Sequence, residues 1–156
     1  MNRLLKVPGH LAVVVAGLAA SGAALAGECP LDKRVEAAST PASPAAKGVT
    51  DTVLTAIDLA SEPAHVAARK LRLRRLVIEP GGVVPWHSHG DRPAIIFVVS
   101  GEATEYASVC SVPIVHRAGE ATPETHATSH WWRNAGKTAA VLLSADLPHD
   151  ESDHAM

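Results

Sequence analysis

Short apolar runs alternate with turn-forming residues along the chain from Thr52 onward. Runs of this kind, rich in β-branched residues and bounded by glycine and proline, are typical of β-strands. They predict strands at residues 53–57, 70–79, 94–100, 103–109, 113–116 and 139–144. Helical periodicity is not sustained over any comparable length, because glycine or proline interrupts it. The pattern therefore predicts an all-β domain built as a closed sheet or a sandwich.

One predicted strand has a strict alternation, since charged residues and leucines take turns from Lys70 to Arg74. Alternate side chains of a strand lie on opposite faces of the sheet. We expect Leu71 and Leu73 to enter the core and the charged face, with Arg72 and Arg74, to be solvated or to protect a sheet edge. A contact between these charges and an acidic ligand or partner is the alternative.

The first 26 residues have the pattern of an export signal. Arg3 and Lys6 supply positive charge, residues 11–18 form an apolar run, and residues 24–26 supply a small-residue cleavage pattern. We expect cleavage after Ala26. The mature protein is then exported, to the periplasm or the medium.

Two alternatives to a cleaved signal remain open. A transmembrane anchor needs about 20 apolar residues, and proline, histidine and glycine shorten the stretch here. A lipid-modified Cys29 is the second alternative, although Glu28 directly precedes it. We therefore expect no membrane association after cleavage.

The rest of the chain divides by composition. Residues 27–50 mix proline, serine, glycine and alanine without an apolar period, which predicts a linker or an extended arm. Residues 51–148 hold the predicted strands, and residues 149–156 form a polar C-terminal tail. A chain of 156 residues has room for one ordinary domain.

Charge and cysteine content narrow the function classes. The formal net charge is −2, and removal of the two basic residues Arg3 and Lys6 brings it to −4, so nothing favours nucleic acid as a partner. The two cysteines, Cys29 and Cys110, would meet an oxidising compartment after export. We predict a disulfide between them that ties the arm to the barrel; two separate thiols are the alternative.

Histidines supply the candidate chemistry. His87 and His89 are separated by one residue, so a strand would place both rings on the same face, within reach of one ion. A second cluster follows at residues 126–134 and contains His126 and His130. His116, by contrast, is expected on an outer strand face.

Residues 82–89, Gly-Val-Val-Pro-Trp-His-Ser-His, resemble the opening of the first motif of the cupin superfamily, and Gly101 stands where that motif closes. Residues 119–134 are similar to the second motif, with His130 and Asn134 at its end. The resemblance implies a double-stranded β-helix (jelly-roll barrel) of about six to eight strands. It further implies a metal held by His87, His89 and His130. Such imidazole ligands suit Fe, Mn, Zn, Ni or Cu.

The sequence departs from the family pattern at several positions. The first motif usually carries a glutamate ligand where this chain has Ala94, and the second motif usually carries a proline and a glycine where it has Thr125 and Ala127. Asp91 and His126 are the candidates for an additional ligand or for a group that supports the ligands.

Aromatic and basic residues flank the predicted ligands. Trp86 and Trp132 are expected to form an apolar wall of the pocket, and parity with His130 places Trp132 rather than Trp131 inside. Arg92 and Arg133 could bind a substrate carboxylate through paired hydrogen bonds, but we expect ordinary surface salt bridges for them.

Three classes of function remain open. The first is a metal-dependent enzyme that binds a small molecule, with dioxygenase as its sharpest form. The second is a non-catalytic exported module that binds a small ligand or the metal itself. The third is an interaction protein whose barrel forms a homodimer through an edge strand. No nucleophile with its base and no phosphate-binding loop is evident in the sequence, so no catalytic residue is assigned.

Overall fold

The computed structural model describes residues 27–36 and 42–149, and these form an all-β domain as predicted. The predicted signal peptide at residues 1–26 and nearly all of the tail lie outside the described residues. A short 3-10 helix, η1, covers Leu31–Lys33, and eight strands follow: β1 Lys47–Asp58, β2 Lys70–Ser88, β3 Ala94–Ser100, β4 Glu102–Ala107, β5 Ile114–Arg117, β6 Ala121–Glu124, β7 Ser129–Arg133 and β8 Ala140–Asp146. Within the described ranges, no helix has the length and apolarity to cross a membrane.

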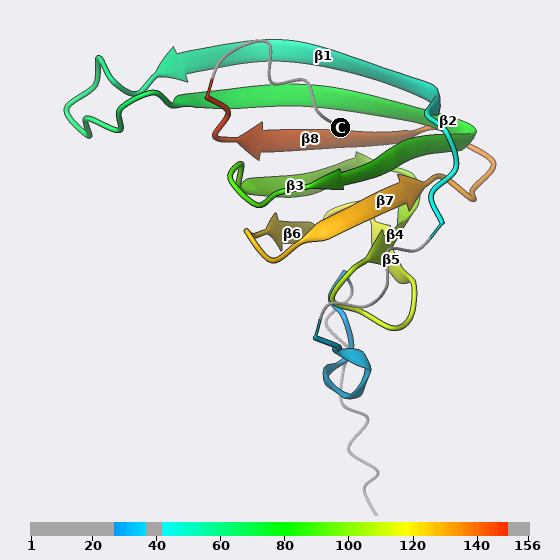
Figure 1. The fold of residues 1–156 in the computed structure, drawn as a ribbon. Helices are drawn as coiled ribbons and strands as arrows, with labels where there is room; N and C mark the ends of the chain where they lie inside the picture. Colours follow the sequence, from blue (N-terminus) through cyan, green and yellow to red (C-terminus); the bar gives the residue numbers. More distant parts are fainter. Residues whose placement is uncertain (1–26, 37–41, 150–156) are drawn as a thin grey trace, which may run out of the picture.

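The strands form a nearly closed sheet in the order β5-β4-β7-β2-β8-β3-β6, and β1 pairs with β2 outside this path. Figure 1 shows β1, β2, β8 and β3 side by side in that order. The long strand β2 pairs with β8 through its first half and with β7 through its second half, so it belongs to both layers of the barrel. The pairing with β7 sets His87 opposite His130, which brings the two predicted ligand motifs together.

Two glycines lie where β2 passes from one layer to the other. Gly81 has a φ of +74°, a left-handed backbone that favours glycine. A Cβ on Gly82 would lie 2.7 Å from the carbonyl oxygen of Glu79 and 2.8 Å from that of Gly48, so this position has no room for a side chain. The strand thus continues to Ser88, well beyond the predicted end at residue 79.

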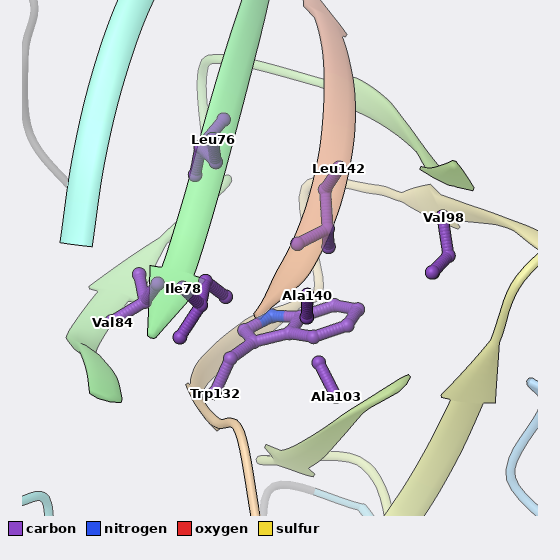
Figure 2. Close-up of a cluster of buried hydrophobic side chains, with 8 residues drawn as sticks. All are labelled: Leu76, Ile78, Val84, Val98, Ala103, Trp132, Ala140 and Leu142. Carbon is purple, nitrogen blue, oxygen red and sulfur yellow. The ribbon is translucent and has the colours of Figure 1, made fainter. Parts of the chain in front are cut away.

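An apolar cluster fills one part of the barrel interior (Figure 2). Its members come from both layers, and each exposes 7% of its surface or less: Leu76, Ile78, Val84, Val98, Ala103, Trp132, Ala140 and Leu142. Figure 2 shows the indole of Trp132 in the middle of the cluster, near Ala103 and Ala140. Burial of each larger side chain stabilises the fold by about 1.5–3 kcal/mol.

The prediction for the alternating segment of β2 is wrong. Arg72 and Arg74 are 1% and 3% exposed and point into the barrel, whereas Leu71 is 43% exposed. Asp146 of β8 explains the reversal, because its carboxylate accepts hydrogen bonds from Nε and Nη2 of Arg72 at 3.0 and 2.8 Å. Charged side chains are buried when a partner compensates their charge, and the partner lies far away in sequence.

The outer face of the same strands carries apolar side chains. Ile57, Leu71, Ile95, Phe97 and Val99 are each between 40% and 58% exposed. Cross-strand pairing sets Ile95 beside Ala145 and Phe97 beside Leu143. The inner face of the sheet formed by β1, β2, β8 and β3 therefore carries buried charged groups beside part of the apolar cluster, and its outer face exposes apolar side chains.

The arm is attached to the barrel by the predicted disulfide between Cys29 and Cys110, which is confirmed. Arg34 forms a β-bridge with Cys110, and the Val35 N–H donates to the Val109 carbonyl at 3.1 Å. Figure 1 shows the described part of the arm, in blue, near the end of the barrel where β4 and β5 lie. A crosslink that closes a loop of 81 residues lowers the entropy of the unfolded chain by an amount worth about 4–5 kcal/mol.

Candidate metal centre

Three imidazole rings converge on one point inside the barrel. His87 comes from β2, His89 from the turn after it, and His130 from β7. Their Nε2 atoms lie 3.2 Å apart for His89 and His87, 3.0 Å for His89 and His130, and 3.1 Å for His130 and His87. His89 and His130 are almost fully buried, and His87 is half-buried.

Hydrogen bonds on the other ring nitrogens define the tautomers. Nδ1 of His87 lies 2.9 Å from the Pro85 carbonyl oxygen, and Nδ1 of His89 lies 3.0 Å from that of Arg92. Nδ1 of His130 lies 2.6 Å from Oε1 of Glu105. Because these oxygens only accept, each Nδ1 carries the proton and donates. Each Nε2 therefore directs a lone pair toward the other two.

This donor set fits a bound transition metal. Nitrogen ligands with bonds of about 2.0–2.1 Å to one ion lie about 2.8–3.4 Å apart, from octahedral to tetrahedral geometry, and the three separations here fall between 3.0 and 3.2 Å. Without a shared cation, three converging lone pairs would repel one another. The residues predicted as ligands are thus the residues that the fold brings together.

The rings of His87 and His89 stay neutral over a wide pH range. Burial, together with the neighbouring His130, lowers the pKa of His87 to about 3 and that of His89 to about 4. A neutral imidazole is the form that binds a metal. Both rings are therefore ready to bind at neutral pH without losing a proton.

A buried carboxylate, which the sequence analysis missed, supports the third ligand. Glu105 on β4 is 3% exposed, and its two oxygens accept from His130 at 2.6 Å and from Nε2 of His116 at 2.8 Å. Burial alone would raise the pKa of Glu105, but the hydrogen bonds from His116 and His130 outweigh it and hold the pKa at about 2. A carboxylate bonded to a metal-binding histidine fixes the ring and increases its basicity. His116 is 1% exposed, so its predicted outer position is wrong.

A second buried glutamate lies opposite the position of the missing family ligand. Glu124 on β6 is the cross-strand partner of Ala94 on β3 and is 2% exposed. Its Oε2 lies 3.5 Å from Nδ1 of His130, and its Oε1 is buried without a hydrogen-bond partner. Burial, with a smaller effect of the charge on Glu105, raises the pKa of Glu124 to about 9. Glu105, Glu124 and Nδ1 of His130 form a second group with metal-ligand spacing, although Glu105 already uses both of its oxygens.

The two residues proposed as additional ligands lie elsewhere. The Asp91 side chain is 63% exposed and binds Arg69 at 2.8 Å and His149 at 2.6 Å. His126 is exposed in the turn between β6 and β7. The structure therefore brings neither side chain into the group formed by His87, His89 and His130.

The tryptophans divide between the inside and the outside of the barrel, as parity along β7 predicts. Trp132 is buried beside His130 with the two rings at 81°, whereas Trp131 stacks on Tyr106 at 3.9 Å. The Trp132 indole N–H lies 3.1 Å from Nδ1 and 3.4 Å from Nε2 of His130. Since Nδ1 already donates to Glu105, we interpret this contact as an N–H directed at the ring face. Trp86 lies on β2 directly before His87 and is half-buried.

The arginines near the centre have different partners from those expected. Arg92 is 5% exposed and donates through Nη1 to Oδ2 of Asp146 at 2.9 Å, and Arg133 is exposed. Arg74, which the sequence analysis placed outside, instead contributes to the lining of a cavity beside the histidines. Alternation identified the strand but not the face.

A narrow cavity extends from the three histidines into the barrel. Its volume is about 30 Å³, and by comparison a water molecule needs about 10–15 Å³ of such space. The lining is mainly apolar and includes Leu76, Ile78, Val84, Ile96, Trp132 and Leu142, with Arg74 and Ser144 as the polar residues besides the histidines. The cavity therefore admits small molecules beside the nitrogens.

The fold and the centre define a class, that of double-sheet β-barrels with three converging histidines. Residues 74–146 match the cupin domain family model. Over these residues the chain is similar to cupin domains. No curated protein matches it.

Two solved structures illustrate the likeness in fold. A double-stranded β-helix protein from Klebsiella pneumoniae is 17% identical with a TM-score of 0.53, and the match covers 69% of this chain and 83% of that one. The cupin domain of Cnp3 from Schizosaccharomyces pombe is 10% identical with a TM-score of 0.51, covering 67% of this chain and 64% of that one. The chain thus spans about 64% of the length of the second structure.

Proposed function

We propose that the protein is an exported cupin that binds a divalent transition metal through His87, His89 and His130 and binds a small molecule in the adjoining cavity. The observation that supports this proposal best is the convergence of three unprotonated Nε2 atoms within 3.2 Å of one another. Imidazole ligands are compatible with Fe, Mn, Zn, Ni or Cu. When bound, the ion supplies Lewis-acid or redox chemistry and has coordination positions not filled by protein.

The chain's own groups have defined tasks in this proposal. Glu105 holds the His130 ring in its binding tautomer, and the carbonyls of Pro85 and Arg92 do the same for His87 and His89. Trp132 and the aliphatic side chains around it exclude bulk water from the cavity. An apolar, enclosed site strengthens the polar interactions made inside it.

Oxygen-dependent oxidation of the bound molecule, as in a dioxygenase, is the catalytic form of the proposal. A non-catalytic module that binds a small ligand is the second candidate, and Ala94 favours it, because the family's carboxylate ligand is missing there. Oxygen uptake by the metal-loaded protein in the presence of candidate substrates separates the two. Ligand binding without uptake supports the binding module.

Metal content tests the shared part of both candidates. Protein purified from its native compartment should contain about one equivalent of a first-row metal by elemental analysis. His89→Ala should lose that metal, and His126→Ala, which changes an exposed histidine outside the centre, should retain it. Equal metal content in the two variants would refute the proposed site.

The export part of the proposal is supported by the disulfide, because disulfides persist mainly in oxidising compartments. The mass of the mature protein tests it directly. Cleavage after Ala26 gives a chain that begins at Gly27 with Cys29 and Cys110 linked. A full-length chain in the cytoplasm would contradict this part and leave the metal site untouched.

A further inference from the structure

The cavity beside the histidines has polar lining residues that the sequence did not indicate. Arg74 of β2 and Ser144 of β8 contribute to its lining, together with the histidines and apolar side chains. Among the described residues that line it, Arg74 is the single charged side chain with a fixed charge, and none is a carboxylate. The electrostatic character of the cavity therefore depends on this guanidinium.

Arg74 is held rigidly in place. It is 3% exposed, and its Nη1 donates to Oδ2 of Asp51 at 2.6 Å, while Nη2 lies 3.2 Å from Oδ2 of Asp146 and 3.5 Å from Oγ of Ser144. Its Nε is buried without a hydrogen-bond partner. A buried donor that lacks a partner is unfavourable, because it has lost its hydrogen bond to water. A ligand with acceptor oxygens would relieve that penalty.

The carboxylates near Arg74 are shared with other cations. Oδ2 of Asp146 also accepts from Arg72 at 2.8 Å and from Arg92 at 2.9 Å, so one oxygen serves three guanidinium groups. The three histidines that line the same cavity are neutral imidazoles, and Ala94 stands where a carboxylate ligand would reduce the charge of a bound ion. Glu105 lies on the Nδ1 side of His130 and does not line the cavity. The Arg74 guanidinium and an ion bound by the three histidines would therefore both attract negative charge into the cavity.

We propose that the small molecule is an anion, specifically a short carboxylate whose oxygens bind Arg74 while its other end faces the histidines. This inference rests on the proposed function, because it names the substrate class of that same site. A guanidinium is suited to carboxylates, since its N–H groups match their two oxygens. The volume of about 30 Å³ limits the occupant to a short chain in this conformation.

Cobalt-loaded protein provides a test that does not depend on turnover. Its visible absorption reports ligands that enter the site, so titration gives dissociation constants for acetate and for acetamide, which has nearly the same shape without the charge. Arg74→Met should weaken acetate binding about ten- to hundredfold, the effect expected for a lost charged hydrogen bond, and should leave acetamide binding unchanged. Arg75→Met is the matched control, because Arg75 is the next residue of β2 and is exposed on the outer face.

A second variant removes the risk that Arg74→Met leaves a buried carboxylate without its partner. The double variant Arg74→Met with Asp51→Asn deletes both members of the pair and should show the same loss of acetate affinity. A crystal structure of the wild-type protein with acetate checks the geometry independently. Carboxylate oxygens within hydrogen-bond distance of the Arg74 guanidinium are expected there.

The outcomes separate this inference from the proposed function. If cobalt does not bind the three histidines, the proposed function fails. If cobalt binds and acetate affinity is equal in wild type and in both Arg74 variants, only the anion proposal fails. Acetate bound away from Arg74 in the crystal would overturn it in the same way.

Discussion

The sheet formed by β1, β2, β8 and β3 departs from the usual distribution of polar and apolar residues at a few positions on each of its two faces. Antiparallel sheets commonly bury an apolar face and solvate a polar one. Here Arg72, Arg74 and Asp146 are buried on the inner face, while Leu71 and Phe97 are 43% and 40% exposed on the outer face. Two residues that are adjacent in sequence, Leu71 and Arg72, thus occupy environments opposite to those their hydrophobicity suggests.

The difference teaches that compensation, and not polarity alone, decides which face enters a barrel. The arginines become compatible with burial because Asp146 forms ion pairs with three of them and Asp51 with one. The arrangement places the charge of Arg74 beside the cavity, whereas an apolar side chain there could make only van der Waals contacts. Charged residues retained in an interior at the expense of stability are candidates for function.

Loss of the shared acceptor should have the largest effect on the inner face. Asp146→Ala leaves the buried Arg72, Arg74 and Arg92 without their common carboxylate, and we expect it to lower the free energy of unfolding by about 3–5 kcal/mol. Urea denaturation followed by tryptophan fluorescence measures this change. Asp51→Ala, which removes the more exposed partner of Arg74 alone, should have a smaller effect. An equal effect of the two substitutions would show that Asp146 is not the centre of the network.

A matched pair on β8 separates the two faces for apolar residues. Leu142 is 3% exposed in the apolar cluster, and the next residue, Leu143, is half-buried on the outer face. Leu142→Ala should destabilise the protein by about 2–4 kcal/mol through loss of packing and creation of a cavity. Leu143→Ala should cost about 1 kcal/mol or less. Similar values for the two variants would mean that the outer face is covered in solution.

The sequence predicted the strands and the convergence of the three histidines better than it predicted the faces. Short strands and the positions of His87, His89 and His130 follow from local alternation and from motif resemblance, both of which are local signals. The orientation of Arg72 and Arg74 depends on Asp146, more than seventy positions away in the chain. Pattern analysis of one segment cannot include such a partner, because cross-strand pairing is fixed only in the folded barrel.

The support of His130 was missed for a related reason. Glu105 and His116 meet because β4 pairs with both β5 and β7, and each residue by itself resembles a surface residue in the sequence. The one usable signal was parity, since Ala103, Glu105 and Ala107 share a face of β4 that is buried throughout. The two alanines on either side of Glu105 on this face are the signal that the glutamate is buried, although its charge by itself would suggest an exposed position.

Two buried carboxylates of the barrel, Asp146 and Glu124, have pKa values shifted in opposite directions, because Asp146 has arginine partners and Glu124 has none among the described arginines. Hydrogen bonds and charges from Arg72, Arg74 and Arg92 lower the pKa of Asp146 against the effect of burial, whereas burial raises that of Glu124 to about 9. A raised carboxyl pKa means that the folded state binds more protons than the unfolded state between the ordinary pKa of 4.5 and about 9. The stability contributed by Glu124 is therefore present below pH 4.5 and is lost as the pH rises toward 9.

Metal-free Glu124→Gln should remove this dependence, because an amide keeps the shape without titrating. Denaturation midpoints of wild type should fall between pH 5 and pH 9, and those of the variant should stay level by comparison. The reverse applies to Asp146, whose pKa is lowered in the folded state. Its contribution to stability is present above the pKa of the unfolded state and is lost as the pH falls through the pKa of the folded state. A wild-type profile with no decline above pH 5 would show that Glu124 ionises in the folded protein without penalty.

The smallest effects are expected on the outer face. Phe97→Lys replaces a side chain that is 40% exposed, and Leu71→Lys one that is 43% exposed, so each should change the free energy of unfolding by about 0.5 kcal/mol or less. Retained cobalt spectra and acetate affinity would show that the centre is insulated from this face. A decrease in the free energy of unfolding of more than about 2 kcal/mol would be comparable with a core truncation. It would mean that Leu71 and Phe97 pack in solution against a surface that is absent from the single chain. The outer face would then be apolar because another surface covers it, and it would no longer be an exception to the usual burial of apolar residues.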